Sequence, residues 1–476
     1  MVGDPCGSRW YGVSCDARKR NVTRLILSAN NLNGLIPSTI HRMTALTILD
    51  FSSNLGLSSF PSQIGLLTSL MALDLSRCSF EGTIPSQIYN LHHVTIFDLS
   101  NNKFSGTIPT QIGGLTSVQY LGLASNNLFG PIPETISQLA SLETLVFGMN
   151  ELNGTIPESV SQLGNLNNIY LPNNQLTGKL PSNIGNLVKL TFLDVSRNSL
   201  DGELPSSIGS LSALDTMVLH TNQIPGTIPE TIGNLRSLKI LHLEFNKLSG
   251  TIPPIGSMVS LTLIDLSVNE LTGTFPETAT AIPSLGYLAI SANKLSGTIP
   301  TTIGELKLLT ELGISENQLI GTLPTQLGNL ISLNSLAVAN NELNGTIPSV
   351  LGYLHTLRML FLNNNQFTGT IPSSFSNLTN LYVFNVFGNK LCGGCFPIPP
   401  TSGLSCNVTN IEFECNCPFS PCGGVKCVSH PCASSQNLLV IVLPSVLGPL
   451  GFLLILVGLI VLCKNKNDPE AQPLNT

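Results

Sequence analysis

Residues 240–253 read ILHLEFNKLSGTIP, and this stretch decides the fold. Its first four residues alternate with a period of two, which predicts a short strand that buries its two leucines. Asn246 follows where the chain must turn inward, and its side-chain amide can satisfy backbone donors and acceptors in that turn. Gly250 and Pro253 predict the return bend, because proline lacks an N–H and suits a bend or the start of a helical turn.

The same phrase returns along most of the chain and keeps its register. Counted at the Asn position, it occurs 16 times, with fourteen steps of 24 residues and one of 23. An I-G-x-L-x-x-L stretch usually follows and predicts a short helical or 3₁₀ segment whose apolar residues face inward. No single repeat can bury its own leucines, so the pattern predicts a repeat solenoid with a ladder of stacked Asn side chains. The position is occupied by Asn30, Asn54, Cys78, Asn102, Asn126, Asn150, Asn174, Asn198, Asn222, Asn246, Asn269, Asn293, Asn317, Asn341, Asn365 and Asn389.

Composition narrows the classes of function. Charged residues make up only 10% of the 476 residues, and the formal net charge is −6. A coiled coil and an acidic disordered chain are excluded, and the lack of basic excess argues against a nucleic-acid binder. The sequence contains no P-loop, no Gly-rich dinucleotide loop and no His-Glu-x-x-His or Gly-x-Ser-x-Gly motif. We therefore expect no enzyme activity and no cofactor.

The repeats resemble the plant-type leucine-rich-repeat family over roughly residues 25–391. Every one of the 15 complete repeats has its proline, from Pro37 to Pro372, and only Ser58 replaces the glycine of the motif. The resemblance implies an α/β repeat solenoid, a right-handed superhelix with a parallel sheet on its inner face. Within the family, the chain more closely resembles receptor-like proteins without a kinase domain.

Two positions depart from the regular repeat. The 23-residue step loses a residue after Pro253, and we expect it to bend the outer face locally while the inner strands stay in register. Cys78 takes an Asn position, where a buried structural thiol is favoured over a reactive cysteine. Aspartates recur four residues before the Asn position, and we expect a solvated structural role for them: Asp50, Asp74, Asp98, Asp194 and Asp265.

The N-terminus resembles the cap of this family. The resemblance implies a Cys6–Cys15 disulfide and packing of the tryptophan on the first repeat, although the longer helical stretch that precedes this point in the family is missing. No apolar run follows Met1, so we interpret the start as a truncated or mis-started one, with a signal peptide missing upstream. The matching residues are Cys6, Trp10, Gly12, Val13 and Cys15.

A cysteine-rich segment follows the repeats, and its start at Asn389 resembles the family's C-terminal cap. Its eight cysteines predict four disulfides of open connectivity, which fits an extracellular protein. Zinc is the alternative, but only Cys392-x-x-Cys395 has ligand spacing and no second such pair follows, so no metal site is predicted. The cysteines are Cys392, Cys395, Cys406, Cys415, Cys417, Cys422, Cys427 and Cys432.

Residues 438–462 carry no charge and would span about 37 Å as a helix, which predicts a single transmembrane helix. Lys464 and Lys466 follow directly, so we expect a cytoplasmic C-terminus and extracellular repeats at the plasma membrane. A tail-anchored protein with cytosolic repeats is the alternative, against which the capping cysteines argue. The expected division is 1–24 N-terminal cap, 25–391 solenoid, 392–437 Cys-rich stalk, 438–462 membrane helix and 463–476 cytoplasmic tail. The sequence also predicts N-glycosylation at Asn21, Asn153, Asn344, Asn377 and Asn407.

The strands of repeats seven to ten differ from the others in carrying aromatic and charged residues. Such side chains are typical of binding patches, although drift on an open face would give the same pattern. We expect these residues to be solvent-exposed on the inner sheet, and the two imidazoles to titrate near their unperturbed pKa of about 6.5. The candidate residues are Tyr170, Arg197, Val218, His220, His242, Glu244 and Phe245.

Two classes of function remain open. The first is a cell-surface recognition protein that binds a peptide, glycan or partner protein on the inner sheet and signals through a co-receptor or kinase partner. The second is a structural or adhesive surface glycoprotein without a signalling role. The mixed middle patch favours the first class, and the uniform Ser and Asn along the rest of the sheet favour the second.

Overall fold

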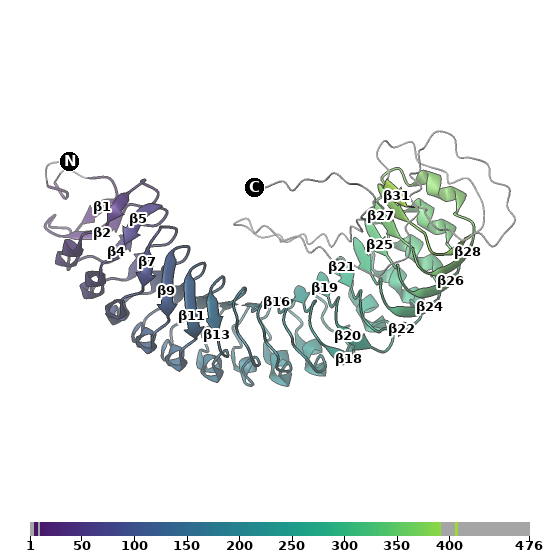
Figure 1. The fold of residues 1–476 in the computed structure, drawn as a ribbon, viewed down its shortest axis with the longest axis horizontal. Helices are drawn as coiled ribbons and strands as arrows, with labels where there is room; N and C mark the ends of the chain where they lie inside the picture. The colour runs from purple at the N-terminus through teal and green to yellow at the C-terminus, as the bar shows by residue number, and fades with distance from the viewer. Residues whose placement is uncertain (1–3, 8–9, 392–404, 408–476) are drawn as a thin grey trace, which may run out of the picture.

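Sixteen short strands, one from each repeat, line the inner face of the chain. The computed structural model describes residues 4–7, 10–391 and 405–407, and the solenoid curves as an arc with these strands along its concave side (Figure 1). All sixteen pair in parallel with their neighbours, and β1 (Val13–Cys15), which is antiparallel, and β31 (Ser405–Asn407) complete an 18-stranded sheet. The sixteen are β2 (Val22–Ile26), β4 (Ile48–Asp50), β6 (Ala72–Asp74), β8 (Ile96–Asp98), β10 (Tyr120–Gly122), β12 (Thr144–Val146), β14 (Asn168–Tyr170), β15 (Phe192–Asp194), β16 (Thr216–Val218), β17 (Ile240–His242), β19 (Leu263–Asp265), β21 (Tyr287–Ala289), β23 (Glu311–Gly313), β25 (Ser335–Ala337), β27 (Met359–Phe361) and β29 (Val383–Asn385).

Many repeats add a second short strand after the Asn turn. These strands form four smaller parallel sheets beside the inner one. The first two sheets are β3 (Asn33–Leu35) with β5 (Gly56–Ser59), and β7 (Glu81–Thr83), β9 (Lys103–Thr107), β11 (Asn127–Pro131) and β13 (Glu151–Asn153). The others are β18 (Ser249–Thr251) with β20 (Glu270–Thr272), and β22 (Ser296–Gly297), β24 (Gln318–Thr322), β26 (Glu342–Thr346), β28 (Gln366–Gly369) and β30 (Lys390–Leu391).

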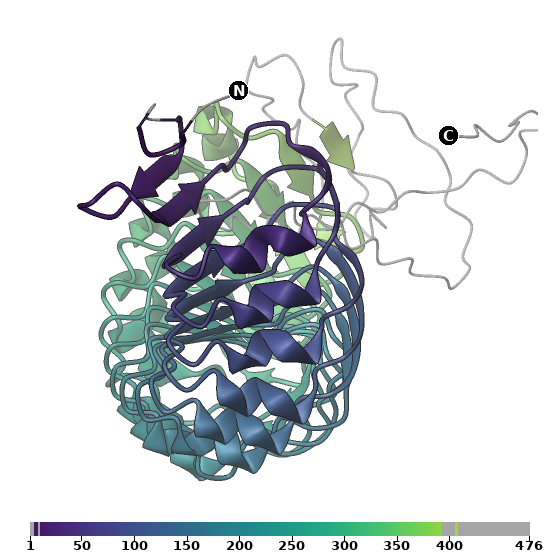
Figure 2. The ribbon, with the colours of Figure 1, turned by 90° about the vertical axis from the view of Figure 1, so that its left-hand side faces the viewer.

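Short 3₁₀ helices form the convex side, as the apolar spacing predicts. They lie on a different side of each coil from the inner strands (Figure 2). Each of them except η7 begins directly after a proline, whose fixed φ suits the first helical turn. The helices are η1 (Ser38–Arg42), η2 (Ser62–Leu66), η3 (Ser86–Asn90), η4 (Thr110–Gly114), η5 (Glu134–Gln138), η6 (Glu158–Gln162), η7 (Ile184–Asn186), η8 (Ser206–Ser210), η9 (Glu230–Asn234), η10 (Glu277–Ala281), η11 (Thr301–Glu305), η12 (Thr325–Asn329), η13 (Ser349–Tyr353) and η14 (Ser373–Asn377).

The predicted Asn ladder is confirmed and joins successive repeats. The Nδ2 of Asn126 donates to the carbonyl oxygens of Leu99 and Leu123, at 3.0 and 3.1 Å, and its Oδ1 accepts from the Phe104 amide at 3.0 Å. The Leu99 carbonyl also accepts from Asn102 at 3.0 Å. Each such carbonyl is therefore shared between two Asn side chains, while one continuous core of leucine, isoleucine and phenylalanine fills the interior.

The residue before the Asn position is held in the left-handed region throughout the solenoid. From Ala29 to Asn364 its φ is 53–57°, although none of these residues is glycine. In exchange its amide bonds to the next repeat, as when Phe245 donates to the Ser267 carbonyl at 3.0 Å. A non-glycine residue in the left-handed region costs about 1–2 kcal/mol of backbone strain. The hydrogen bonds between stacked repeats therefore impose this conformation, and the local preference of the residue does not.

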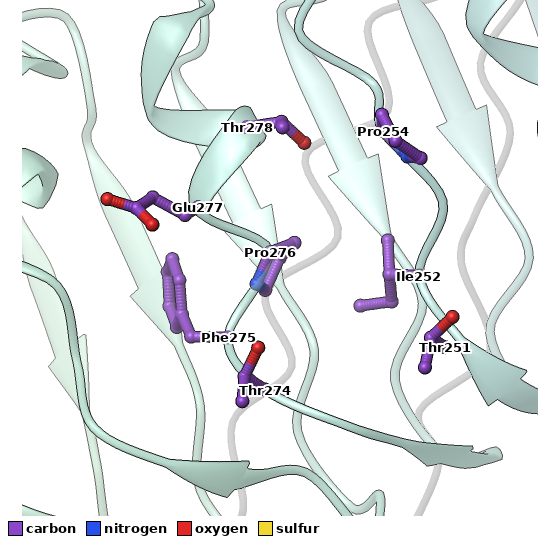
Figure 3. A pocket seen from close by; sticks show the side chains of 8 residues that line it. All are labelled: Thr251, Ile252, Pro254, Thr274, Phe275, Pro276, Glu277 and Thr278. Atoms are coloured by element: carbon purple, nitrogen blue, oxygen red, sulfur yellow. The ribbon is translucent and has the colours of Figure 1, made fainter.

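The inner strands keep their register across the shortened repeat, as predicted, with Ile240 opposite Leu263. On the outer side no 3₁₀ helix forms between η9 and η10, and a surface hollow of about 190 Å³ opens there (Figure 3). Pro254, Phe275 and Pro276 are among the residues that line it.

The N-terminal cap contains the disulfide that the resemblance implies, between Cys6 and Cys15. Cys78 is a free, buried thiol that donates to the Phe51 carbonyl at 3.3 Å, as a structural thiol should. No helix in the described ranges is long and apolar enough to cross a membrane. The proposed stalk disulfides and the segment 438–462 lie outside those ranges, as does the side chain of Asn407.

Candidate functional site

The middle strands bring the candidate residues together on the inner face. Tyr170, Val218 and His242 each end a strand, and the pairing of β14 to β17 places them in one register column. His220 and Glu244 lie two residues farther along their repeats, next to this column. Arg197 and Phe245 occupy the left-handed turn position. Residues up to 75 positions apart in sequence therefore share one surface.

The expectation that all candidate residues are solvent-exposed is wrong for His242 and Glu244. His242 and Glu244 are 3% and 5% exposed, whereas Tyr170, His220 and Phe245 are half-buried. The Nδ1 atom of His242 lies 3.1 Å from Glu244 Oε2, because side chains two residues apart point to the same face of a strand. The strands β16 and β19 flank β17 on its two sides, and their side chains cover this pair. The sequence of one repeat does not show how much its neighbours cover.

The two imidazoles do not share one ordinary pKa. Burial lowers the pKa of His220. The negative charge of Glu244 opposes this effect, while the positive charges of His242 and Arg197 act in the same direction as burial. Burial also opposes the charged form of His242, but the hydrogen bond and the negative charge of Glu244 outweigh it and raise the pKa of that imidazole. The rings lie 6.1 Å apart between centroids, so they form an unequal pair.

The aspartate column is structural, as expected, but it is not uniformly solvated. Asp194 and Asp265 are 8% and 2% exposed. In each, Oδ1 accepts the amide of the serine two residues later at 2.9 Å. Burial and the charge of Glu244 raise the pKa of Asp265 to about 7. Buried acidic side chains therefore lie among the candidate residues, which the sequence does not indicate.

An apolar stripe runs beside the column, and the sequence reasoning missed it. Phe192, Thr216, Ile240, Leu263 and Tyr287 stand opposite one another in register on five neighbouring strands, and all five are half-buried. Phe192 also stacks on the ring of Tyr170, with centroids 6.3 Å apart. The sequence does contain this pattern, because the stripe residues lie two positions before the column residues of the same strands. Residues two apart in a strand face the same side.

The predicted glycosylation sites are accessible where the structure describes them. Asn21, Asn153, Asn344 and Asn377 are all exposed. Asn153 and Asn344 belong to the outer strands β13 and β26, away from the inner sheet. Glycans on Asn153 and Asn344 would therefore leave the inner face free.

Comparisons with known proteins agree with this architecture. A family profile for the leucine-rich repeat region matches residues 170–278, and further leucine-rich-repeat profiles match 20–80, 68–128 and 356–378. The nodulation receptor kinase of Pisum sativum is 47% identical over 55 residues, which is 11% of this chain and 6% of that protein.

Solved structures match over a much longer stretch. The crystal structure of a TDR receptor has a TM-score of 0.66 and 33% identity, covering 81% of this chain and 63% of that one. The ectodomain of the Arabidopsis receptor kinase HAESA, solved with a peptide hormone ligand, has a TM-score of 0.52 and 30% identity, covering 82% and 81%. HAESA has also been solved with the hormone IDA and the co-receptor SERK1, at 28% identity. This chain therefore spans less than two thirds of the TDR structure and a small part of the pea kinase.

Proposed function

Because this chain belongs to the leucine-rich-repeat family, we propose that it is a cell-surface recognition protein whose inner sheet binds a peptide or protein ligand. The apolar stripe on β15 to β21 carries this proposal. Half-buried aromatic and aliphatic side chains on a rigid sheet offer contact area at little entropic cost. The HAESA structure with a peptide hormone supports a ligand of this class.

The dimensions of the stripe suit a peptide. Four strand spacings of about 4.8 Å give a length of about 19 Å, which matches about six residues of an extended chain. Tyr170 and Phe192 stand at one end, and Tyr287 stands at the other. A ligand with apolar side chains near both ends would fit this spacing, with its centre over Thr216, Ile240 and Leu263.

Signalling and location are further parts of the proposal. We propose that the repeats are extracellular and glycosylated, that residues 438–462 anchor the chain in the plasma membrane, and that a kinase or co-receptor partner transmits the signal. The exposed sequon asparagines and the Cys6–Cys15 disulfide support an extracellular location. The HAESA complex with SERK1 supports a co-receptor partner. The proposed role is recognition without catalysis.

A peptide-display screen against the purified full chain tests the proposal. Selected peptides should bind the parent protein and lose at least tenfold in affinity to Phe192→Ala or Tyr287→Ala, since buried aromatic anchors contribute most of the energy of such interfaces. Leu308→Ala and Ile331→Ala are matched controls, because these residues are 58% and 70% exposed and lie outside the inner strands. Peptides that bind all four variants as tightly as the parent would show that the stripe is not the site.

A further inference from the structure

We propose that His242, Glu244 and Asp265 form a binding site for a divalent transition-metal ion, with Zn²⁺ the best match. One donor atom from each residue lies within 4.8 Å of the other two. This site lies beside the proposed ligand stripe, whose Tyr287 hydroxyl contacts Asp265, but uses other side chains. It concerns a buried polar cluster that the recognition function does not use.

The cluster is built across the shortened repeat. His242 ends β17, Asp265 ends β19, and the two residues are direct partners in the parallel pairing. Glu244 follows on the same face as His242. The two strands are joined by the one 23-residue step, so a bound ion would tie together the repeats on either side of the irregularity.

The charges of the cluster call for a cation. Two carboxylates and one imidazole are 2–5% exposed, and in the part of the chain that the structure describes no Lys or Arg forms an ion pair with them. Buried carboxylates are normally paired or bound to metal, because an uncompensated buried charge is costly. A divalent ion with a neutral imidazole and two carboxylates gives a net charge of zero.

Each residue of the cluster also keeps one nitrogen or oxygen atom without a close hydrogen-bond partner among the described residues. Within the described residues, neither Glu244 Oε1 nor His242 Nε2 has a hydrogen-bond partner, and neither is sealed from solvent as the Tyr89 hydroxyl is. Asp265 Oδ2 has only a long contact of 3.4 Å with the Tyr287 hydroxyl. Water and small ions can therefore reach the cluster through these atoms.

The donor set selects the kind of metal. Imidazole nitrogen with carboxylate oxygen suits Zn²⁺, whereas Ca²⁺ requires six to eight oxygen ligands. Zinc bonds of about 2.0–2.2 Å put neighbouring donors about 3.3 Å apart. The distance of 3.1 Å between His242 Nδ1 and Glu244 Oε2 is already close to this value, so an ion bound there would replace the proton of their hydrogen bond. The other gaps close with shifts of about 1.5 Å or less, which rotation of the carboxylates can supply.

The half-buried His220 stands next to these donors. Its ring centroid lies 6.1 Å from that of His242, and its Nδ1 contacts the Thr221 hydroxyl at 3.0 Å. It could supply a fourth ligand after a side-chain rotation, with water as the alternative. Three protein ligands and one open position are typical of reactive zinc sites, whereas a fourth protein ligand would close the site.

The test measures Zn²⁺ binding by the full chain after metals have been removed with a chelator. Asp265→Asn should lower the stoichiometry by one Zn²⁺, or weaken one site at least tenfold. Asp74→Asn is the matched control, because Asp74 holds the equivalent strand position, has Asp50 and Asp98 as register partners in place of a histidine, and accepts the Ser76 amide at the same 2.9 Å. Since the comparison is between variants, zinc bound by cysteines elsewhere cancels.

Co²⁺ spectra and melting temperatures test the same site independently of the Zn²⁺ stoichiometry. Co²⁺ at the site should show a spectrum without a thiolate charge-transfer band, and that signal should disappear in Asp265→Asn and Glu244→Gln. Zn²⁺ should raise the melting temperature of the parent and of Asp74→Asn only. If Asp265→Asn fails to fold, Glu244→Gln and His242→Gln give the same comparison. Equal zinc stoichiometry and affinity in the parent and in the folded cluster variants would overturn the proposal, since protons would then be sufficient to neutralise the acids.

Discussion

Replacing Asn126 by alanine should cost about 2–4 kcal/mol of local stability. Its Oδ1 is the acceptor found for the buried Phe104 amide among the described residues, and an unpaired buried amide costs about 1–3 kcal/mol. The Leu99 and Leu123 carbonyls each keep a second Asn donor, so their losses are smaller and add about 1 kcal/mol together. The sum is a large fraction of the stability of an ordinary domain.

Hydrogen exchange is the suitable assay, because a long repeat array need not unfold in one step. Amides around Phe104 and in β10 should exchange faster in Asn126→Ala, while those of distant repeats stay unchanged. Asn127→Ala is the control: its side chain is exposed and makes no hydrogen bond in the described structure. If the two variants protect the Phe104 amide equally, the ladder does not stabilise the solenoid in the way described here.

Three further predictions address single residues. Tyr89→Phe should raise the free energy of unfolding by about 1–2 kcal/mol, and the melting temperature with it, since the buried hydroxyl has no hydrogen-bond partner among the described residues. A fall in melting temperature would mean that a water pairs with it. Burial raises the pKa of Asp98, and the negative charge of Asp74 adds to this, although hydrogen bonds from Ser100 oppose it. Because the folded state then binds the proton more tightly than the unfolded state, the parent loses stability as pH rises through that pKa. Asp98→Asn should therefore be more stable than the parent at pH 7 and equal to it in acid, and thermal melts that differ equally at both pH values would contradict this. Gly250→Ala should cost about 1–2 kcal/mol, because φ is +70° and the added Cβ would meet Thr227 Cγ2 at 2.8 Å, whereas Gly164→Ala meets nothing within 4 Å and should melt close to the parent.

The fold was predictable because its rules are local. Alternating leucines, an Asn at a fixed step and a proline before each helical turn predict the strand, the ladder and the 3₁₀ helix of every repeat. Even the shortened repeat could be placed, because losing a residue after Pro253 affects the outer side alone. The left-handed residue before the Asn was not predicted, since Phe245 and Val268 have no intrinsic preference for that conformation and only the stacked carbonyls impose it.

The site was predictable only in part, because it depends on contacts between repeats. The sequence identified the strands that carry Tyr170 and His242, and the structure brings them into one column. It did not identify which side chains are covered, since the burial of His242 arises from residues 23–24 positions away on the neighbouring strands. The stripe through Ile240 and Leu263 was missed because alternation alone makes such residues look like part of the core.

Cys78 has a consequence for cooperativity. In this repeat the Asn position of the ladder holds a cysteine, so a thiol replaces the side-chain amide. The thiol offers one weak donor, whereas the Asn126 amide offers two donors and a strong acceptor. In a repeat array, the energy of each interface decides whether neighbouring repeats melt together or separately. The interface at Cys78 is thus a weak coupling between the first repeats and the rest. Under mild stress the segment from β2 to β4 should separate from β6 and open as its own unit, with the disulfide-bonded cap attached to it.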